Sequence, residues 1–269
     1  DTYVAWCLKA GGEPTADNDN TSGAMDANSV SVGGVLQSSY TPAGSPSKYP
    51  TRMSIAAHGG FSIVTYGDCG GSSKTIPHGL STSLPDAGKP GIVLVKATNA
   101  SRNWRMYHED LTSERILYLD GEDAEANEPD SFGTINTTIF TVDGGNGTSA
   151  SGENHIAYCF ARVPGLIGIG TYTGGGSNYP HIIIDDGASG FKPAMIINKA
   201  ISGTGAWQIR DNARSTYNPA NETLEPDTDR TESSVAAQPM DFLSNGFRPM
   251  TSGTNVNGSG WTYVYLAFA

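Results

Sequence analysis

Short apolar segments separated by polar turns dominate the chain. They mix β-branched and aromatic residues, and no stretch of roughly 12 or more residues shows a convincing helical period. The segments predicted to be strands in the middle of the chain are 61–66, 91–97, 103–108, 115–119, 138–142 and 154–161. Two of them, 91–97 and 154–161, are nearly continuous apolar runs, which predicts central strands covered on both faces. The pattern therefore predicts an all-β fold.

Several of these segments recur further along the chain in the same order. The matching pairs are 89–96 with 192–199, Trp104 with Trp207, 63–66 with 169–172, and Phe140 with Phe247. Their offsets lie between 103 and 107 residues. Because self-similarity at a nearly fixed period is typical of repeat architectures, we interpret the chain as a duplication.

One further strand pattern occurs three times, at residues 3–8, 155–161 and 263–269. Gly-containing turns precede the second and third copies. Short strands at turn-separated spacing favour tandem antiparallel β-sandwich units of the jelly-roll or lectin-like type. We therefore predict two such units, at 59–163 and 164–269, because each is long enough to hold its own core.

Residues 1–58 are expected to hold the terminal strand of a preceding unit, followed by an insertion. The insertion, 10–57, has the Gly, Ser and Pro content of a loop, and a structureless loop of that length is unusual inside a compact domain. An inserted hairpin, an arm onto a neighbouring subunit and a binding loop remain alternatives for it.

The composition of the chain argues against some classes of binding partner. The formal net charge is −11 and only 16% of the residues are charged, with no basic stripe, which argues against binding nucleic acid. No apolar run approaches the roughly 20 residues needed to cross a membrane, so no membrane insertion is expected. No signal peptide is recognised, and since residue 1 is not Met, the start was processed or the chain is part of a longer one.

The cysteines predict neither a disulfide framework nor a zinc site. There are three of them, Cys7, Cys69 and Cys159, and no pair has CxxC spacing. This usage favours synthesis in a reducing compartment. Cys7 and Cys159 occupy one repeat position, where Ala267 stands in the last copy, so we expect that position to be small and buried.

One oxygen-rich turn is a candidate metal site. The run 17–23 begins with Asp17, Asn18 and Asp19, and calcium takes about six to eight oxygen ligands. Asp17 and Asp19 are therefore candidate calcium ligands, and an Asx-rich turn is the alternative interpretation. Asp185 and Asp186 form a similar pair that also fits a plain hairpin turn.

No catalytic motif is present. The chain has no nucleophile elbow, phosphate loop or zinc-protease helix. Glu109 and Asp110 are adjacent, so on a strand they point to opposite faces and do not form the facing pair of a glycosidase. His78 and His181 align in the repeat as turn residues, and His155 takes a position where the other copies have Tyr, which favours packing. We expect no enzyme activity and no cofactor other than calcium.

Trp104 and Trp207 are equivalent by repeat. Exposed aromatic rings stack on sugars, which suggests a lectin-like site. An aromatic residue kept in both units is more simply a core anchor, and we expect that role for both.

Together the repeated motifs resemble a repeat domain of marine tailed phages. The motifs that carry the resemblance are those at 60–66, 77–80, 92–96, 103–108, 153–161 and 241–247. The resemblance implies a virion structural protein of the tail-fibre or concanavalin-like lectin type and implies no catalytic residue. Residues 180–183 read Pro-His-Ile-Ile where the first unit has Pro-His-Gly-Leu, so a ligand site shared by the family is in question for the second unit.

We therefore expect a structural component of a bacteriophage virion, a tail fibre or a capsid-surface fibre or decoration. Such a protein would be made in the host cytoplasm, assemble as a homo-oligomer and contact other virion proteins. A carbohydrate-binding adhesin that recognises host glycans is the first alternative and requires exposed aromatic residues. A polysaccharide depolymerase is the second and requires two carboxylates facing each other across a groove.

Overall fold

The computed structural model describes residues 3–144, 147–232 and 238–269, and they form almost only strands and turns. We call residues 59–163 the first half and 164–269 the second half. Helical structure in the described residues is limited to a 3-10 turn, η1 (Pro85–Gly88), and one turn of α-helix, α1 (Thr254–Asn257). No helix in this part of the chain is long and apolar enough to cross a membrane. The predicted all-β fold is confirmed.

The first half, together with strands contributed by residues 10–57, forms a large main sheet and a small sheet. The main sheet has the order β2-β1-β3-β4-β12-β6-β7-β8-β9, and the small sheet has the order β10-β11-β5. The strands are β1 (Val30–Val32), β2 (Val35–Leu36), β3 (Arg52–Ile55), β4 (Phe61–Tyr66), β5 (Lys74–Pro77), β6 (Ile92–Ala97), β7 (Arg105–His108), β8 (Arg115–Tyr118), β9 (Ala126–Asn127), β10 (Phe132–Ile135), β11 (Ile139–Val142) and β12 (His155–Phe160).

The second half repeats this plan with fewer strands. Its main sheet has the order β13-β19-β15-β16, and its small sheet has the order β14-β18-β17. The strands are β13 (Ile167–Thr173), β14 (Ile182–Ile183), β15 (Met195–Ala200), β16 (Gln208–Asp211), β17 (Met240–Leu243), β18 (Gly246–Pro249) and β19 (Thr262–Phe268).

Repeat-equivalent strands have equivalent neighbours. The order β4-β12-β6-β7 in the first half corresponds to β13-β19-β15-β16 in the second, and β5-β11-β10 corresponds to β14-β18-β17. Side chains follow the same rule: Tyr66 stacks on His155 at 5.0 Å between ring centroids, and Tyr172 stacks on Tyr263 at 4.8 Å. The duplicated segments therefore take the same place in each half.

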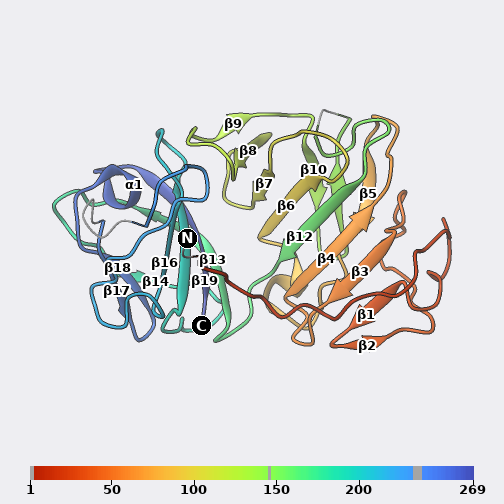
Figure 1. The fold of residues 1–269 in the computed structure, drawn as a ribbon, viewed down its shortest axis with the longest axis horizontal. Coiled ribbons are helices and arrows are strands. Elements are labelled where there is room, and N and C mark those ends of the chain that lie inside the picture. The colour runs from red at the N-terminus through yellow and green to blue at the C-terminus, as the bar shows by residue number, and fades with distance from the viewer. Residues whose placement is uncertain (1–2, 145–146, 233–237) are drawn as a thin grey trace.

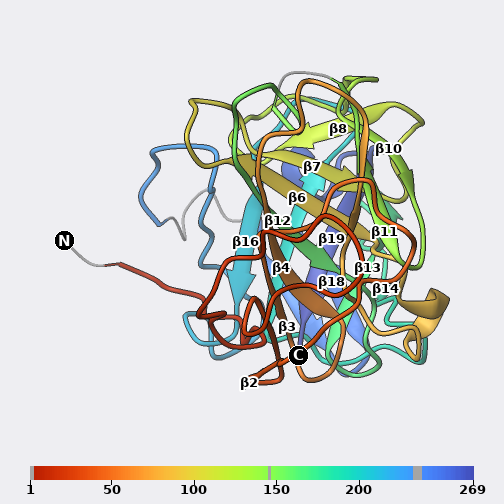
Figure 2. The ribbon, with the colours of Figure 1, turned by 90° about the vertical axis from the view of Figure 1, so that its right-hand side faces the viewer.

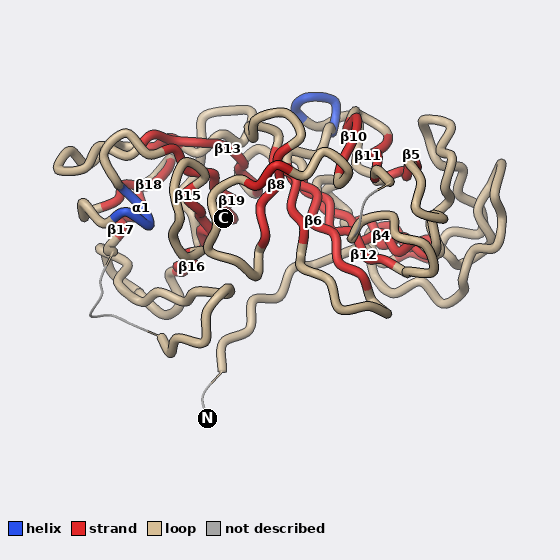
Figure 3. Tube along the Cα trace, turned by 90° about the horizontal axis from the view of Figure 1, so that it is seen from above, coloured by secondary structure: helices blue, strands red, loops and turns tan. Residues whose placement is uncertain are grey.

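The sheets are layered, with the two main sheets facing each other in the middle (Figures 1 and 3). One apolar core lies between the main and small sheets of the first half, and a second fills the same space in the second half. A third core lies between the two main sheets and joins the halves. Each half is thus sandwich-like, and each main sheet is covered on both faces.

This layering explains the continuous apolar runs of the central strands. In β12, Ala157 and Cys159 point into the core of the first half, whereas Tyr158 and Phe160 point into the core between the halves. Alternate residues of a strand face opposite sides, so a strand with two covered faces needs apolar residues at consecutive positions. The predicted central placement of 91–97 and 154–161 is confirmed, since β6 and β12 are interior strands.

The insertion at 10–57 contributes strands to the first half. β3 pairs antiparallel with β4, and β1 pairs parallel with β3, so the insertion extends the edge of the main sheet. Loop composition did not predict these strands, because they are short and are ordered by pairing with a strand outside the insertion, β4, and with each other. The segment is an addition to its own half in this structure.

Residues 3–10, which we call the N-terminal segment, form no strand in the described chain. The segment leaves the first half, crosses to the second and projects from the body of the molecule (Figures 1 and 2). The strand predicted at 3–8 is therefore not formed here, because the described residues place no strand beside it. Cys7 is exposed, which corrects the expectation of a buried position, whereas its equivalent Cys159 is buried as expected.

Candidate functional site: the cavity between the halves

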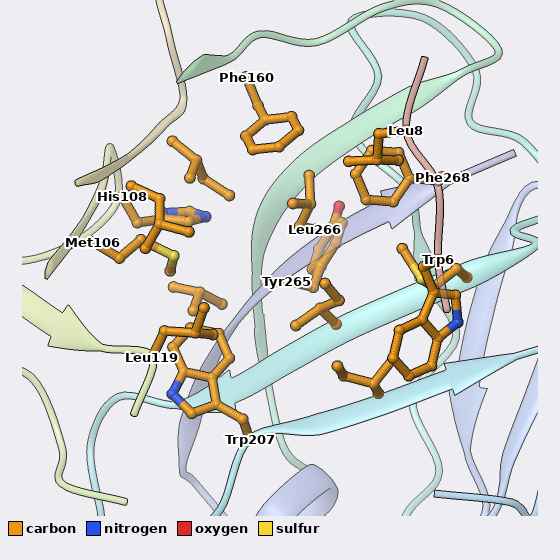
Figure 4. Close-up of a pocket in the computed structure, with 16 residues that line it drawn as sticks. Trp6, Leu8, Met106, His108, Leu119, Phe160, Trp207, Tyr265, Leu266 and Phe268 are labelled. Atoms are coloured by element: carbon orange, nitrogen blue, oxygen red, sulfur yellow. The ribbon is translucent and has the colours of Figure 1, made fainter. Parts of the chain in front are cut away.

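An apolar cavity of about 180 Å³ lies between the two main sheets, and we call it the inter-half cavity (Figure 4). Its walls come from both halves and from the N-terminal segment. The residues that line it are Trp6, Leu8, Ile92, Leu94, Met106, His108, Leu119, Phe160, Met195, Ile197, Trp207, Ile209, Val264, Tyr265, Leu266 and Phe268. Because nearly every lining atom is carbon or sulfur, the cavity suits apolar groups and offers little to a charged ligand.

The N-terminal segment bounds one side of the cavity through Trp6 and Leu8. Trp6 donates a hydrogen bond from Nε1 to Oδ2 of Asp211 at 3.0 Å, and the Arg214 guanidinium lies 5.4 Å from its ring centroid. Burial alone would raise the pKa of Asp211, but hydrogen bonds from Arg214 and Trp6 lower it. The segment is thus fixed to β16 by a charged partner at the edge of the second half.

Two titratable groups line the cavity, His108 and Tyr265. Burial, together with the nearby Arg162, lowers the pKa of His108 to about 3, so its imidazole is neutral at pH 7. His108 Nδ1 accepts a hydrogen bond from the backbone N–H of Asp110 at 3.2 Å. The Tyr265 hydroxyl accepts one from the N–H of Asp185 at 2.8 Å. Both groups therefore accept hydrogen bonds from the backbone beside the cavity.

A charged cluster joins the halves beside the cavity. Arg162 contacts Glu109 of the first half, and lies 3.1 Å from a carboxylate oxygen of both Asp86 and Asp185. Burial raises the pKa of Glu109, and Arg162 opposes that rise. Since Lys89 lies 3.9 Å from the other oxygen of Glu109, both of its carboxylate oxygens have a cation nearby.

Glu109 and Asp110 differ in exposure and in partners. The Glu109 side chain is 13% exposed and belongs to the Arg162 cluster, whereas the Asp110 side chain is 40% exposed. Both residues line one surface pocket together with Asp86, Arg162 and Asp185.

A groove of about 560 Å³ lies on the first half, next to this cluster. It is lined by the half-buried rings of Tyr107 and Phe132, whose centroids are 6.1 Å apart, and by Glu114, Glu128 and Asp143 among its polar residues. Glu128 accepts hydrogen bonds from the Tyr118 hydroxyl at 2.7 Å and from Arg105 at 3.1 Å. Burial alone would raise the pKa of Glu128, but these two hydrogen bonds lower it.

The candidate calcium ligands Asp17 and Asp19 are both exposed and serve different contacts. Asp17 pairs with Arg52, whereas the backbone N–H of Asp19 donates to Oδ2 of Asp26 at 2.8 Å. Among the described residues, no three His, Cys, Asp or Glu side chains lie close enough together to hold a metal ion. Asn18 organises the turn, since its side chain bonds to the carbonyl of Pro50 at 3.0 Å and to the N–H of Asp26 at 2.9 Å.

Trp104 and Trp207 have different surroundings despite their common repeat position. Trp207 is 2% exposed, lines the inter-half cavity and donates from Nε1 to the carbonyl of Tyr118 at 2.8 Å. Trp104 is half-buried and lies 6.1 Å from Tyr158 between ring centroids. The expected role as a core anchor is confirmed for Trp207. Trp104 packs at the margin of the same region.

The aligned histidines also differ. His78 is buried, with Nδ1 accepting from the N–H of Leu80 at 3.0 Å and Nε2 lying 3.2 Å from the carbonyl of Asn136. His181 is exposed and lies 3.1 Å from Oδ1 of Asn245. His155 is buried in the stack with Tyr66, as its repeat position predicts.

Asp186 accepts a hydrogen bond from the backbone N–H of Gly165 at 2.8 Å. It therefore organises a turn, as the hairpin-turn interpretation of this pair expects.

Sequence reasoning did not single out Trp6 and Arg162. The repeated strand pattern carries a usable indication for Trp6, because the equivalent positions Tyr158 and Leu266 are also large and apolar. For Arg162 we find no comparable indication, since its partners come from three separate parts of the chain.

Comparison with known families gives one match. A family model described as "Domain of unknown function (DUF7483)" matches residues 38–269, from within the insertion through both halves. No curated protein and no solved structure was found to match the chain.

Proposed function

The chain belongs to the family described as a domain of unknown function, DUF7483, and within it we propose that it is a structural component of a bacteriophage virion. In this role it is a rigid building block of a tail fibre or of a capsid-surface fibre or decoration. The observation that carries the proposal is the joining of two equivalent halves through one shared apolar core. The resemblance of the repeated motifs to a tailed-phage repeat domain is the reason for proposing that the particle is a bacteriophage.

The joint between the halves supports this mechanical role. Only a few residues separate the end of β12 from the start of β13, and the halves also meet through the Arg162 cluster. Domains connected by a flexible linker reorient freely, whereas a large apolar interface holds them in one arrangement. A chain built this way transmits force along a fibre and displays its loops from a stiff frame.

We also propose that each half is a β-sandwich repeat of the lectin-like or jelly-roll type. In each half a main sheet packs against a small sheet and encloses a core that belongs to that half alone. The equivalent strands follow the same order in both halves, which supports the proposal. Homo-oligomerisation on the particle is part of the proposal, because fibres and decorations are usually symmetric assemblies.

The surroundings of the carboxylates support a non-enzymatic role. A glycosidase needs one carboxyl group free to donate a proton and another free to attack or to activate water. Glu109 is engaged by Arg162 and Lys89, and Glu128 is engaged by Tyr118 and Arg105. A depolymerase is therefore the weakest of the three functional hypotheses.

Mass spectrometry of purified phage particles, with immunogold labelling by an antibody against the chain, tests the structural role. We expect the chain in stoichiometric amounts in the particle, with label on the tail or the capsid surface. Particles that lack the chain while the infected cell contains it in soluble form would remove the proposal.

A carbohydrate-binding adhesin is the second candidate, and the groove with Tyr107 and Phe132 favours it. Half-exposed aromatic rings beside carboxylates are a common arrangement for holding a sugar, because a ring stacks on its apolar face while carboxylates accept from its hydroxyls. Binding to a glycan array that disappears in Tyr107→Ala, with circular dichroism unchanged, would support it. Tyr217→Ala is the matched control, since Tyr217 is 86% exposed and does not line the groove.

A further inference from the structure

The inter-half cavity is large for the interior of a folded protein and carries no charge. Its volume is about 180 Å³, whereas apolar cavities of roughly 150 Å³ in other proteins already stay dry and bind benzene. Of the described residues that line it, none is Asp, Glu, Lys or Arg, and His108 is neutral at pH 7. An apolar guest would gain dispersion contacts here, whereas a charged guest would lose its water without finding a partner.

Aromatic and sulfur-containing side chains form much of the wall. Phe160 and Phe268 pack edge to face at 6.0 Å between ring centroids, and Trp207 lies on the opposite side of the cavity (Figure 4). Met106 and Met195 add a flexible thioether from each half. Aromatic rings attract other rings in edge-to-face or offset arrangements, and thioether sulfur atoms contact ring edges favourably. The wall therefore favours an aromatic guest over an aliphatic one of the same volume.

One part of the wall lies outside the two main sheets. All the lining residues except Trp6 and Leu8 lie in strands of the main sheets or next to a strand end. Leu8 is 42% exposed and Trp6 is half-buried, whereas the remaining lining residues are buried or half-buried. The side formed by the N-terminal segment is therefore the side of the cavity nearest to solvent.

Trp6 is held in this wall by two side chains of the second half. Its Nε1 donates to Oδ2 of Asp211 at 3.0 Å, and the Arg214 guanidinium lies 5.4 Å from its ring centroid. Asp211 and Arg214 also pair with each other at 2.6 Å, and that ion pair does not need Trp6. Moving the Trp6 side chain aside breaks one hydrogen bond and one cation–π contact, whereas an opening elsewhere has to part paired strands or the shared core.

We propose that the inter-half cavity is a binding site for one small, uncharged aromatic molecule, and that this molecule enters past Trp6. The bound ring packs between the pair Phe160 and Phe268 on one side and Trp207 on the other, and Trp6 closes the site behind it. The proposal goes beyond the virion role and does not depend on it.

NMR of the methionine methyl groups, with benzene titrated into the 269-residue chain, tests the site without any substitution. Met106 and Met195 line the cavity, whereas Met53 and Met240 are fully buried in the cores of the first and second half and serve as controls. We expect ring currents from benzene to shift the signals of Met106 and Met195 and to leave those of Met53 and Met240 in place. Equal shifts of all four signals, or no shift up to the solubility limit of benzene, would overturn the proposal.

Benzoate tests the chemical class of the ligand, because it has the same ring with a negative charge. At pH 7 we expect benzoate to leave the signals of Met106 and Met195 unchanged, since the cavity offers no cation to replace the lost water. Benzoate that shifts these signals as strongly as benzene does would overturn the assignment to uncharged molecules.

Two variants test the walls of the site. Ile197→Trp places a further ring in the cavity and should weaken benzene binding about tenfold or more, whereas Ile63→Trp makes the same change in the same core outside the cavity and should not. Trp6→Ala removes the movable wall and should speed the exchange of benzene about tenfold in NMR line shapes. Unchanged affinity in folded Ile197→Trp would overturn the placement of the ligand, and unchanged exchange in Trp6→Ala would overturn the entry route.

Discussion

The two halves of the molecule have the same strand order and fill their cores differently. In the first half, Val64 on β4 lies opposite Ala157 on β12. In the second half the equivalent pair is Gly170 on β13 and Tyr265 on β19. The larger residue of the pair is therefore on β4 in the first half and on β19, the strand equivalent to β12, in the second half. The repeat therefore conserves the volume shared by a pair of strands rather than the residue at each position.

The stacked aromatic rings of the two halves also keep the same geometry although the residues differ. Tyr66 and Tyr172 each donate a hydrogen bond from the hydroxyl group to a backbone carbonyl, of Thr148 and Val256 respectively, at 2.8 Å. The ring beneath them is His155 in one half and Tyr263 in the other. Both halves thus have a flat ring at this position, although its polar atoms differ.

The largest expected effect separates the two equivalent tryptophans. Trp207→Ala should lower the free energy of unfolding by about 4 kcal/mol, because it enlarges the cavity and removes the hydrogen bond to Tyr118. Trp104→Ala should lower it by roughly 1–2 kcal/mol, since that ring is only half-buried. Urea unfolding followed by circular dichroism measures both changes. Equal losses at the two positions would show that the shared core does not depend on Trp207.

The next largest effect tests whether the residues at 170 and 265 compensate for each other in volume. A Cβ atom at Gly170 would lie 2.8 Å from the Tyr265 hydroxyl oxygen, so Gly170→Val should destabilise the protein by about 3 kcal/mol. Adding Tyr265→Ala recreates the Val–Ala pair of the first half and should recover part of that loss. The free energies of unfolding of the two single variants and the double variant form the required cycle. Strict additivity of the two changes would contradict compensation between the strands.

The sequence predicted those parts of the fold that depend on local pattern. All six strands predicted in the middle of the chain are present within about two residues of their expected ends. Trp207 is the buried anchor that its repetition indicated. These successes rest on β-branched and aromatic runs, which carry their own structural preference.

Features that arise from contacts between distant segments were not predictable in the same way. The strands β1 and β3 lie in a region of loop composition; β3 pairs with β4, and β1 pairs with β3. The ion pair between Asp17 and Arg52, which is distant in sequence, was not predicted either. The repeat shows which residues are equivalent, but not that the equivalent faces of the two halves meet and enclose a cavity.

Acid should affect the first half through His78. Burial lowers the pKa of His78 to about 4, from an ordinary value of 6.5. The folded state resists protonation, so its stability is complete above pH 6.5 and is lost as the pH falls from 6.5 towards 4. Between pH 7.5 and 5 this amounts to about 2 kcal/mol.

The variant His78→Gln should be less sensitive to pH over that range by the same amount, although His108 and His155 are also buried and keep part of the dependence. His181→Gln is the matched control, because the equivalent His181 is exposed and should leave the wild-type profile unchanged. Urea midpoints at pH 7.5 and pH 5 measure the difference. An unchanged profile in His78→Gln would exclude this histidine as the acid-sensitive group.

The smallest expected effect has the opposite sign and concerns a charge that the first half lacks. Arg210 stands where the first half has Tyr107, and it is 1% exposed. It donates to the side-chain oxygen of Gln208 at 3.2 Å, while its Nε and Nη1 atoms find no hydrogen-bond partner among the described residues. Burial lowers its pKa to about 10, which still leaves it charged at pH 7.

A buried cation with unused donors is costly, and an apolar residue of similar length avoids that penalty. Arg210→Met should therefore raise the free energy of unfolding by about 1 kcal/mol. Arg230→Met is a control at an exposed position, where the expected change is within about 0.5 kcal/mol. A loss of stability in Arg210→Met would mean that the guanidinium contributes more to the second core through its neighbours than its desolvation removes. The second half would then depend on a buried charge that the first half replaces with Tyr107.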